Sequence, residues 1–151
     1  MLERISPFYR NARKEITKAP VVYFEDLGFR NYAAGVFGRV EEGSILGFLF
    51  ENLTLFLLKE KISLTPDKIH FWRTKDGAEV DFLIDDSGQT PFEIKYQSLK
   101  KAEMTRSFRN YIEKYKPKEA FIINLTLSIT VTLDDTIVHY LPINKFIGYK
   151  L

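Results

Sequence analysis

The sequence predicts an α/β fold in which a mixed β-sheet is flanked by helices. Three observations favour this class. Apolar runs of strand length are interspersed with helical segments, Gly-containing turns separate three consecutive strand-like runs, and a buried-type strand follows a polar helix. The chain has 151 residues, of which 45% are hydrophobic and 15% aromatic. We therefore expect one domain over residues 1–151 with a substantial core.

The first part of the chain combines a basic start with two helical patterns. Asp26 and Ser44 are good N-cap residues, and each precedes a helical pattern. The elements expected here are a basic N-terminal extension over 1–20, a strand over 21–25, a helix over 27–36, and the clearest helix over 45–61.

The remainder is dominated by strand patterns. Turn signals at 75–77 and 85–88 join three strands into an expected antiparallel meander, and Pro117 ends the polar helix after them. The expected elements are strands over 69–73, 79–84 and 91–96, a helix over 98–115, a buried strand over 119–125, and a strand pair over 128–133 and 136–141 joined by Asp134 and Asp135.

Composition excludes several classes of site. The chain has no cysteine, which excludes disulfides, thiolate zinc sites and cysteine nucleophiles. The most apolar segment, 45–58, carries Glu51 and is too short to span a bilayer, and no signal peptide is evident, so we expect a cytoplasmic protein without a membrane partner. A net charge of +2 does not by itself argue for nucleic acid.

The strand over 91–96 carries the first candidate functional pair. Because side chains alternate along a strand, Glu93 and Lys95 share one face and lie about 6–7 Å apart. Such a pair can contact one phosphate and one metal ion. The alternative is an ordinary exposed, charged strand face.

A second carboxylate is expected beside this pair. If strands 79–84 and 91–96 pair through their turn, Asp81 lies next to Glu93. Adjacent carboxylates are unfavourable unless a cation or proton compensates them, and a hard divalent ion is the simplest compensation. Alternatively, Asp81 is a solvated residue near a turn.

Glu51 supplies a third carboxylate. Its helical neighbours are small or apolar, so it faces the packed side of its helix, where a lone carboxylate is costly. It either reaches the sheet edge beside Asp81 or pairs with an arginine or a hydroxyl across the interface.

Glu on an early helix, then Asp, then Glu-x-Lys on successive strands resembles the PD-(D/E)XK nuclease superfamily. The closer match is to a family of unknown function found at the C-terminus of many prokaryotic AAA-type ATPases. Residues 71–82 (FWRTKDGAEVDF) followed by 93–95 (EIK) resemble its signature, and segments 7–11, 18–20, 23–24, 26–28 and 47–53 resemble it further. The resemblance implies a restriction-endonuclease-like fold, and the chain is expected to be part of a longer ATPase or a stand-alone relative.

The same resemblance implies a metal-dependent phosphodiesterase acting on nucleic acid, with DNA favoured. Asp81, Glu93, Glu51 and the carbonyl of Ile94 would hold Mg²⁺ or Mn²⁺, and Lys95 would orient or deprotonate the attacking water. Two alternatives remain open: an inactive nucleic-acid-binding module, and a domain that docks on an ATPase and controls its assembly. The chain has no phosphate loop of the Gly-x-x-x-x-Gly-Lys-Ser/Thr type.

The helix after the site carries cations that could contact phosphates, chiefly Lys101, Arg106 and Arg109. The alternative is a solvated helix face.

His70 and His139 are expected to be ordinary strand residues, and Trp72 is expected to be either a core residue or a lid over the site. Gln97, which follows the Glu-x-Lys strand, is a further candidate for contact with phosphate or water.

Overall fold

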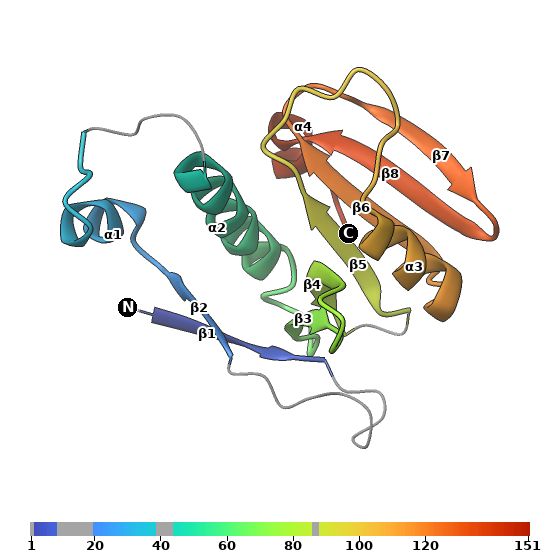
Figure 1. The fold of residues 1–151 in the computed structure, drawn as a ribbon, viewed down its shortest axis with the longest axis horizontal. Helices are drawn as coiled ribbons and strands as arrows, with labels where there is room; N and C mark the ends of the chain where they lie inside the picture. The colour runs from blue at the N-terminus through green and yellow to red at the C-terminus, as the bar shows by residue number, and fades with distance from the viewer. Residues whose placement is uncertain (1, 9–19, 39–43, 86–87) are drawn as a thin grey trace.

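A mixed eight-stranded sheet forms the centre of the protein, with helices on both faces (Figure 1). The computed structural model describes residues 2–8, 20–38, 44–85 and 88–151. Within them, the strand order is β2-β1-β3-β4-β5-β6-β8-β7. The basic residues within 9–19, Gly43 and the turn residues 86 and 87 lie outside the described ranges.

The elements follow the sequence expectations over most of the chain. The strands are β1 (Leu2–Pro7), β2 (Val21–Phe24), β3 (Ile69–Arg73), β4 (Glu79–Ile84), β5 (Thr90–Ile94), β6 (Glu119–Asn124), β7 (Ile129–Leu133) and β8 (Thr136–Pro142). The helices are α1 (Leu27–Ala33), α2 (Ser44–Lys61), α3 (Arg106–Tyr115) and α4 (Ile143–Gly148).

The predicted antiparallel meander of β3, β4 and β5 is confirmed by the strand register. Its first turn contains Gly77 at φ 84°, a backbone conformation that glycine adopts without strain. A bulge between His70 and Trp72 shifts the β3–β4 register. The meander therefore places the expected Asp81 strand directly beside the Glu93 strand.

Parallel pairing makes the sheet mixed. β5 pairs in parallel with β6, and β6 pairs in parallel with β8. The crossover from β5 to β6 carries α3, as a parallel connection requires. β7 and β8 form the predicted antiparallel hairpin, with Asp134 at φ 51° in its turn.

Both faces of the sheet are covered. On one face, Phe82 and Phe92 pack with side chains of α2 and α4, and Phe92 stacks on Phe121 at a centroid distance of 4.9 Å. On the other face, Leu83 and Ile122 belong to the cluster that contains the apolar stripe of α3. The sheet is thus the middle of three layers, and a polar side chain on it is shielded unless it lies at a strand end.

The structure differs from the sequence expectations chiefly at five places. β5 ends at Ile94, so Lys95 and Tyr96, which were expected in the strand, follow it. Leu2–Pro7 form a strand inside the predicted N-terminal extension, and Ile143–Gly148 form a helix that was not predicted. α1 ends at Ala33, three residues before the predicted end. α3 begins at Arg106 rather than at residue 98, because the Thr105 side chain accepts the Phe108 N–H and caps the helix there.

None of the helices in the described ranges is long and apolar enough to cross a membrane.

Candidate functional site

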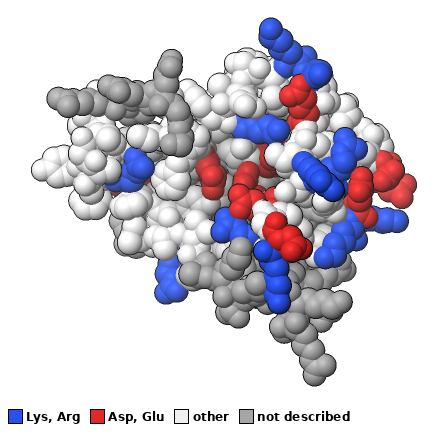
Figure 2. Space-filling model, viewed as in Figure 1, with Lys and Arg blue, Asp and Glu red and all other residues white. Residues whose placement is uncertain are grey.

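A hollow of about 600 Å³ opens where β4 and β5 meet the first turns of α2 and α3. In the space-filling view, acidic atoms gather in the hollowed centre of this face and basic side chains surround them (Figure 2). Three of the four predicted catalytic residues, Asp81, Glu93 and Lys95, line it. The other lining residues are Gly47, Gly77, Glu79, Val80, Ile94, Tyr96, Gln97, Thr105 and Ser107.

Asp81 is held by the neighbouring strand. The β4–β5 register pairs Phe82 with Phe92, so Asp81 is next in line opposite Glu93. The Asp81 Oδ2 atom accepts a hydrogen bond from the Ile94 N–H at 2.7 Å. The Asp81 carboxylate therefore accepts a hydrogen bond from the backbone of β5, which fixes the carboxylate beside that strand.

Glu93 is buried and oriented by α3. It is only 5% exposed, and both of its carboxylate oxygens accept the Thr105 N–H, at 3.1 and 3.3 Å. Thr105 is the N-cap residue of α3, so the carboxylate lies at the helix end that favours negative charge. Lys95 Nζ lies 3.9 Å from Glu93 Oε1 and is itself mostly buried. The predicted Glu93–Lys95 pair is therefore a shielded pair rather than an exposed strand face.

The electrostatics of the site favour a cation. Burial, followed by the negative charge of Glu51, raises the pKa of Asp81 to about 8, and the charges of Glu93 and Glu79 act in the same direction. Burial also raises the pKa of Glu93, while the Thr105 hydrogen bonds and Lys95 lower it. Acidic charge is thus crowded around Asp81 beyond what the nearby lysine balances.

Glu51 contributes to the same electrostatic field. Its Oε1 accepts a hydrogen bond from the Tyr23 hydroxyl at 2.5 Å, and Glu51 is absent from the residues that line the hollow. Burial is the main reason that its pKa is raised. Of the two alternatives for Glu51, the structure contains the pairing with a hydroxyl across the interface, although Glu51 also acts electrostatically on Asp81.

The residues at the hollow could bind a divalent ion, but with fewer side-chain ligands than the sequence predicted. Within the described part of the chain, no group of three His, Cys, Asp or Glu side chains is close enough together to hold a metal ion. The remaining set is the carboxylates of Asp81 and Glu93 and the backbone carbonyl of Ile94, the residue that follows Glu93. These are hard oxygen donors, and Mg²⁺ in proteins is commonly bound by one or two carboxylates with water in its other positions.

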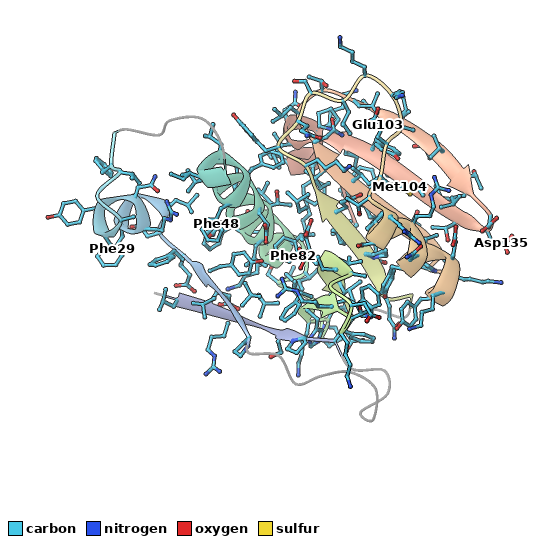
Figure 3. The ribbon with its side chains drawn as sticks, in the orientation of Figure 1. Phe29, Phe48, Phe82, Glu103, Met104 and Asp135 are labelled. Carbon is cyan, nitrogen blue, oxygen red and sulfur yellow. The ribbon has the colours of Figure 1, made fainter. Side chains whose placement is uncertain are left out.

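The candidate phosphate-binding cations lie next to the hollow. Arg106 and Arg109 are exposed on the first turns of α3, beside the lining residues Thr105 and Ser107. Lys101 lines a second hollow that shares Gln97 with the first, and its Nζ is 3.5 Å from Glu103 Oε1. Figure 3 labels Glu103 and Met104 on the segment that leads into α3.

The other side chains singled out in the sequence are structural. Trp72 is 3% exposed in the α3-side core, where its Nε1 donates to the Tyr115 hydroxyl, so it is core and not a lid. His139 lies on β8 between Thr130 and Glu119, and His70 lies on β3 against Phe8.

Comparison with known proteins places the chain in a family. The model described as "Domain of unknown function (DUF4143)" matches residues 46–146. The chain belongs to this family. The DUF4143 match runs from within α2 to within α4 and contains all four predicted catalytic residues. It agrees with the expectation of a family of unknown function.

Two curated relatives are similar to the DUF4143 chain. They are the uncharacterized proteins Rv2008c of Mycobacterium tuberculosis and Mb2031c of Mycobacterium bovis, each 29% identical over 114 residues. Each match covers 73% of this chain and 25% of the relative, so the chain matches about a quarter of the length of these proteins. No solved structure matches the chain.

Sequence reasoning missed Tyr23 and Thr105, which hold Glu51 and Glu93. Thr105 could have been found, because a threonine three residues before an apolar helix position is an N-cap signal. Tyr23 carries no local signal, since its contact with Glu51 joins residues 28 positions apart.

Proposed function

We propose that this chain is a metal-dependent phosphodiesterase of the PD-(D/E)XK type, with a restriction-endonuclease-like fold, and that it acts on nucleic acid. The observation that carries the proposal is the joint placement of three side chains around one open hollow: Asp81 and Glu93 on two paired strands, and Lys95 directly after the end of β5. The mixed sheet with its meander and a crossover helix supports the fold assignment.

Asp81, Glu93 and the Ile94 carbonyl would hold Mg²⁺ or Mn²⁺. When bound, such an ion supplies Lewis-acid stabilisation of charge on a phosphate and lowers the pKa of a bound water. Its positive charge would also offset the two effects that raise the pKa of Asp81, which are burial first and then repulsion from neighbouring carboxylates.

The chain's own residues would prepare the site in three ways. The Ile94 N–H and the Thr105 N–H fix the two carboxylates before substrate arrives, which reduces the reorganisation needed for reaction. Lys95, shielded beside Glu93, would orient the attacking water and donate a hydrogen bond to the phosphate as negative charge develops. Glu51 would act at a distance, through its charge on Asp81.

Nucleic acid is the favoured substrate because exposed cations flank the acidic centre. Arg106, Arg109 and Lys101 would hold phosphates on either side of the scissile one, with DNA the favoured polymer. The greater length of the relatives leaves room for a second module in the natural protein, and an AAA-type ATPase is the partner that the sequence resemblance implies.

A binding function without turnover is the second candidate. It is favoured by the pairing of Glu51 with Tyr23, because only two of the three predicted ligand carboxylates, Asp81 and Glu93, then line the hollow. In that case the domain would bind nucleic acid or dock on an ATPase and control its assembly.

Cleavage assays distinguish these candidates. Linear, branched and single-stranded DNA and RNA should be incubated with the full-length protein, with and without Mg²⁺ or Mn²⁺. The proposal predicts metal-dependent cleavage of at least one substrate and none by Asp81→Ala. Cleavage that survives in Asp81→Ala would assign the activity to something other than this site.

A further inference from the structure

One border of the sheet is formed by β7, beyond which the described residues add no further strand. β7 has the sequence Ile-Thr-Val-Thr-Leu and contains none of the charges, prolines or bulges that usually protect an edge strand from pairing. The opposite border of the sheet, formed by β2, is partly covered by a side chain. There, the Asn52 side chain binds both the N–H and the C=O of Phe24 in β2.

The register identifies the backbone groups that β7 offers. Leu133 and Thr136 flank a two-residue turn, and residues in that position exchange hydrogen bonds with each other. Because hydrogen-bonded pairs alternate along an antiparallel ladder, Leu133, Val131 and Ile129 bond to β8. Thr130 and Thr132 therefore direct their N–H and C=O groups away from the sheet.

The side chains of β7 are chemically palindromic about Val131. From either end, the strand reads apolar, Thr, apolar, Thr, apolar. We propose that β7 pairs with β7 of a second copy of this chain, antiparallel and about a two-fold axis at Val131. Thr130 then pairs with Thr132 of the second copy, and Ile129 with Leu133, so that like side chains meet across the axis.

The ends of the strand are complementary in charge in this register. Asp134 of one copy lies opposite Ser128 of the other, because both are three residues from Val131. The Ser128 hydroxyl accepts a hydrogen bond from Lys145 Nζ at 3.0 Å. Each end of the paired strands therefore brings the acidic Asp134–Asp135 turn of one copy to the lysine of the other. This complementarity favours a second copy over an unrelated strand.

Exposed apolar side chains near this edge, one on each face of the sheet, are consistent with such a partner. Ile129 on β7 and Ile137 on β8 are 39% and 41% exposed. Five-residue strand pairing buries less surface than a standard protein interface. The dimer is therefore a weak one that dissociates on dilution.

Sedimentation equilibrium of the full-length protein over a wide concentration range tests the proposal. Wild type should show a monomer–dimer equilibrium. Thr132→Pro removes an outward N–H without removing a bond to β8, and should raise the dimer dissociation constant at least tenfold. Lys145→Glu places a negative charge against the acidic turn and should raise it severalfold. Lys75→Glu makes the same charge change in the β3–β4 turn and should leave it unchanged.

Two results would overturn the proposal: a wild-type protein that stays monomeric at the highest concentration, or a dimer that neither Thr132→Pro nor Lys145→Glu weakens. Lys145 is exposed on α4, so Lys145→Glu remains informative if Thr132→Pro does not fold.

Hydrogen exchange measures the contact at β7 directly. The amides of Thr130 and Thr132 should exchange more slowly as protein concentration rises, and unchanged exchange in a sample that forms dimers would place the contact elsewhere.

Discussion

The carboxylate of Asp81 accepts the backbone N–H of Ile94 at 2.7 Å, across two strands that pair antiparallel. This contact joins one proposed metal ligand, Asp81, to the residue whose carbonyl is another proposed ligand, Ile94. The site is therefore built from two strands as one unit, and its properties should change together when either carboxylate is altered.

Divalent metal binding should be detectable without any substrate. An ion that binds only the folded protein raises its melting temperature. We expect Mg²⁺ or Mn²⁺ to raise the melting temperature of wild type, and Asp81→Asn and Glu93→Gln to lose most of the increase. Glu113→Gln, an isosteric change at an exposed position on α3, should retain it. An equal metal-induced increase in all four proteins would count against the site.

The stability of the metal-free protein should depend on pH through Asp81. The pKa of this carboxyl is raised to about 8 in the folded chain, from about 4 in an unfolded one. Between these values the folded state binds the additional proton, so stability falls as pH rises. Because Asn cannot ionise, Asp81→Asn should gain stability relative to wild type from pH about 4 to about 8. Urea unfolding in chelator measures this difference, and a difference that stays constant with pH would contradict the prediction.

The Tyr23–Glu51 hydrogen bond should be important for stability. Tyr23→Phe removes the donor and leaves a shielded carboxylate without it, which we expect to reduce the free energy of unfolding by roughly 1–3 kcal/mol. Glu51→Gln keeps an acceptor for the hydroxyl and should be less harmful. Chemical denaturation at fixed pH makes the comparison. Equal stability of Tyr23→Phe and wild type would show that the bond is of no energetic consequence.

Salt dependence should identify the phosphate contacts. Each phosphate contact contributes about 0.9 to the slope of log affinity against log salt concentration on duplex DNA. The single variants Arg106→Ala and Arg109→Ala should each reduce the slope by about that amount. Lys101→Ala should also reduce the slope. Lys118→Ala, at an exposed position just before β6, should leave it unchanged. Equal slopes for all of these proteins would place the nucleic acid elsewhere.

The meander and the strand pair that carries Asp81 and Glu93 were predictable because their signals are local. Alternation in 79–84 and 91–96, together with glycine turns, predicted both the register and the proximity of Asp81 to Glu93. β1 was missed because Ile5 is its only buried residue, so its alternation is too weak to distinguish it from a basic extension. The start of α3 was placed too early because 98–105 is polar, like the helix that follows, and only the Thr105 cap marks the boundary.

The partner of Glu51 could not be selected from sequence. Helical spacing placed Glu51 on the packed side of α2, and both a metal and a hydroxyl remained open as its compensation. The choice depends on β2, which brings Tyr23 to α2 through the tertiary fold. Contacts of this kind carry no periodic signal.

The most direct test of the central claim measures cleavage and affinity side by side, at fixed salt, for wild type, Asp81→Ala and Lys95→Ala. Loss of the Asp81 carboxyl removes a metal ligand and, above its pKa of about 8 in the metal-free protein, also a charge that repels phosphate. The account predicts metal-dependent cleavage by wild type, none by either variant, unchanged or tighter binding by Asp81→Ala, and slightly weaker binding by Lys95→Ala. Folded wild type that binds nucleic acid but cleaves no duplex, branched or single-stranded substrate with any divalent metal would contradict the account and support a binding or assembly module.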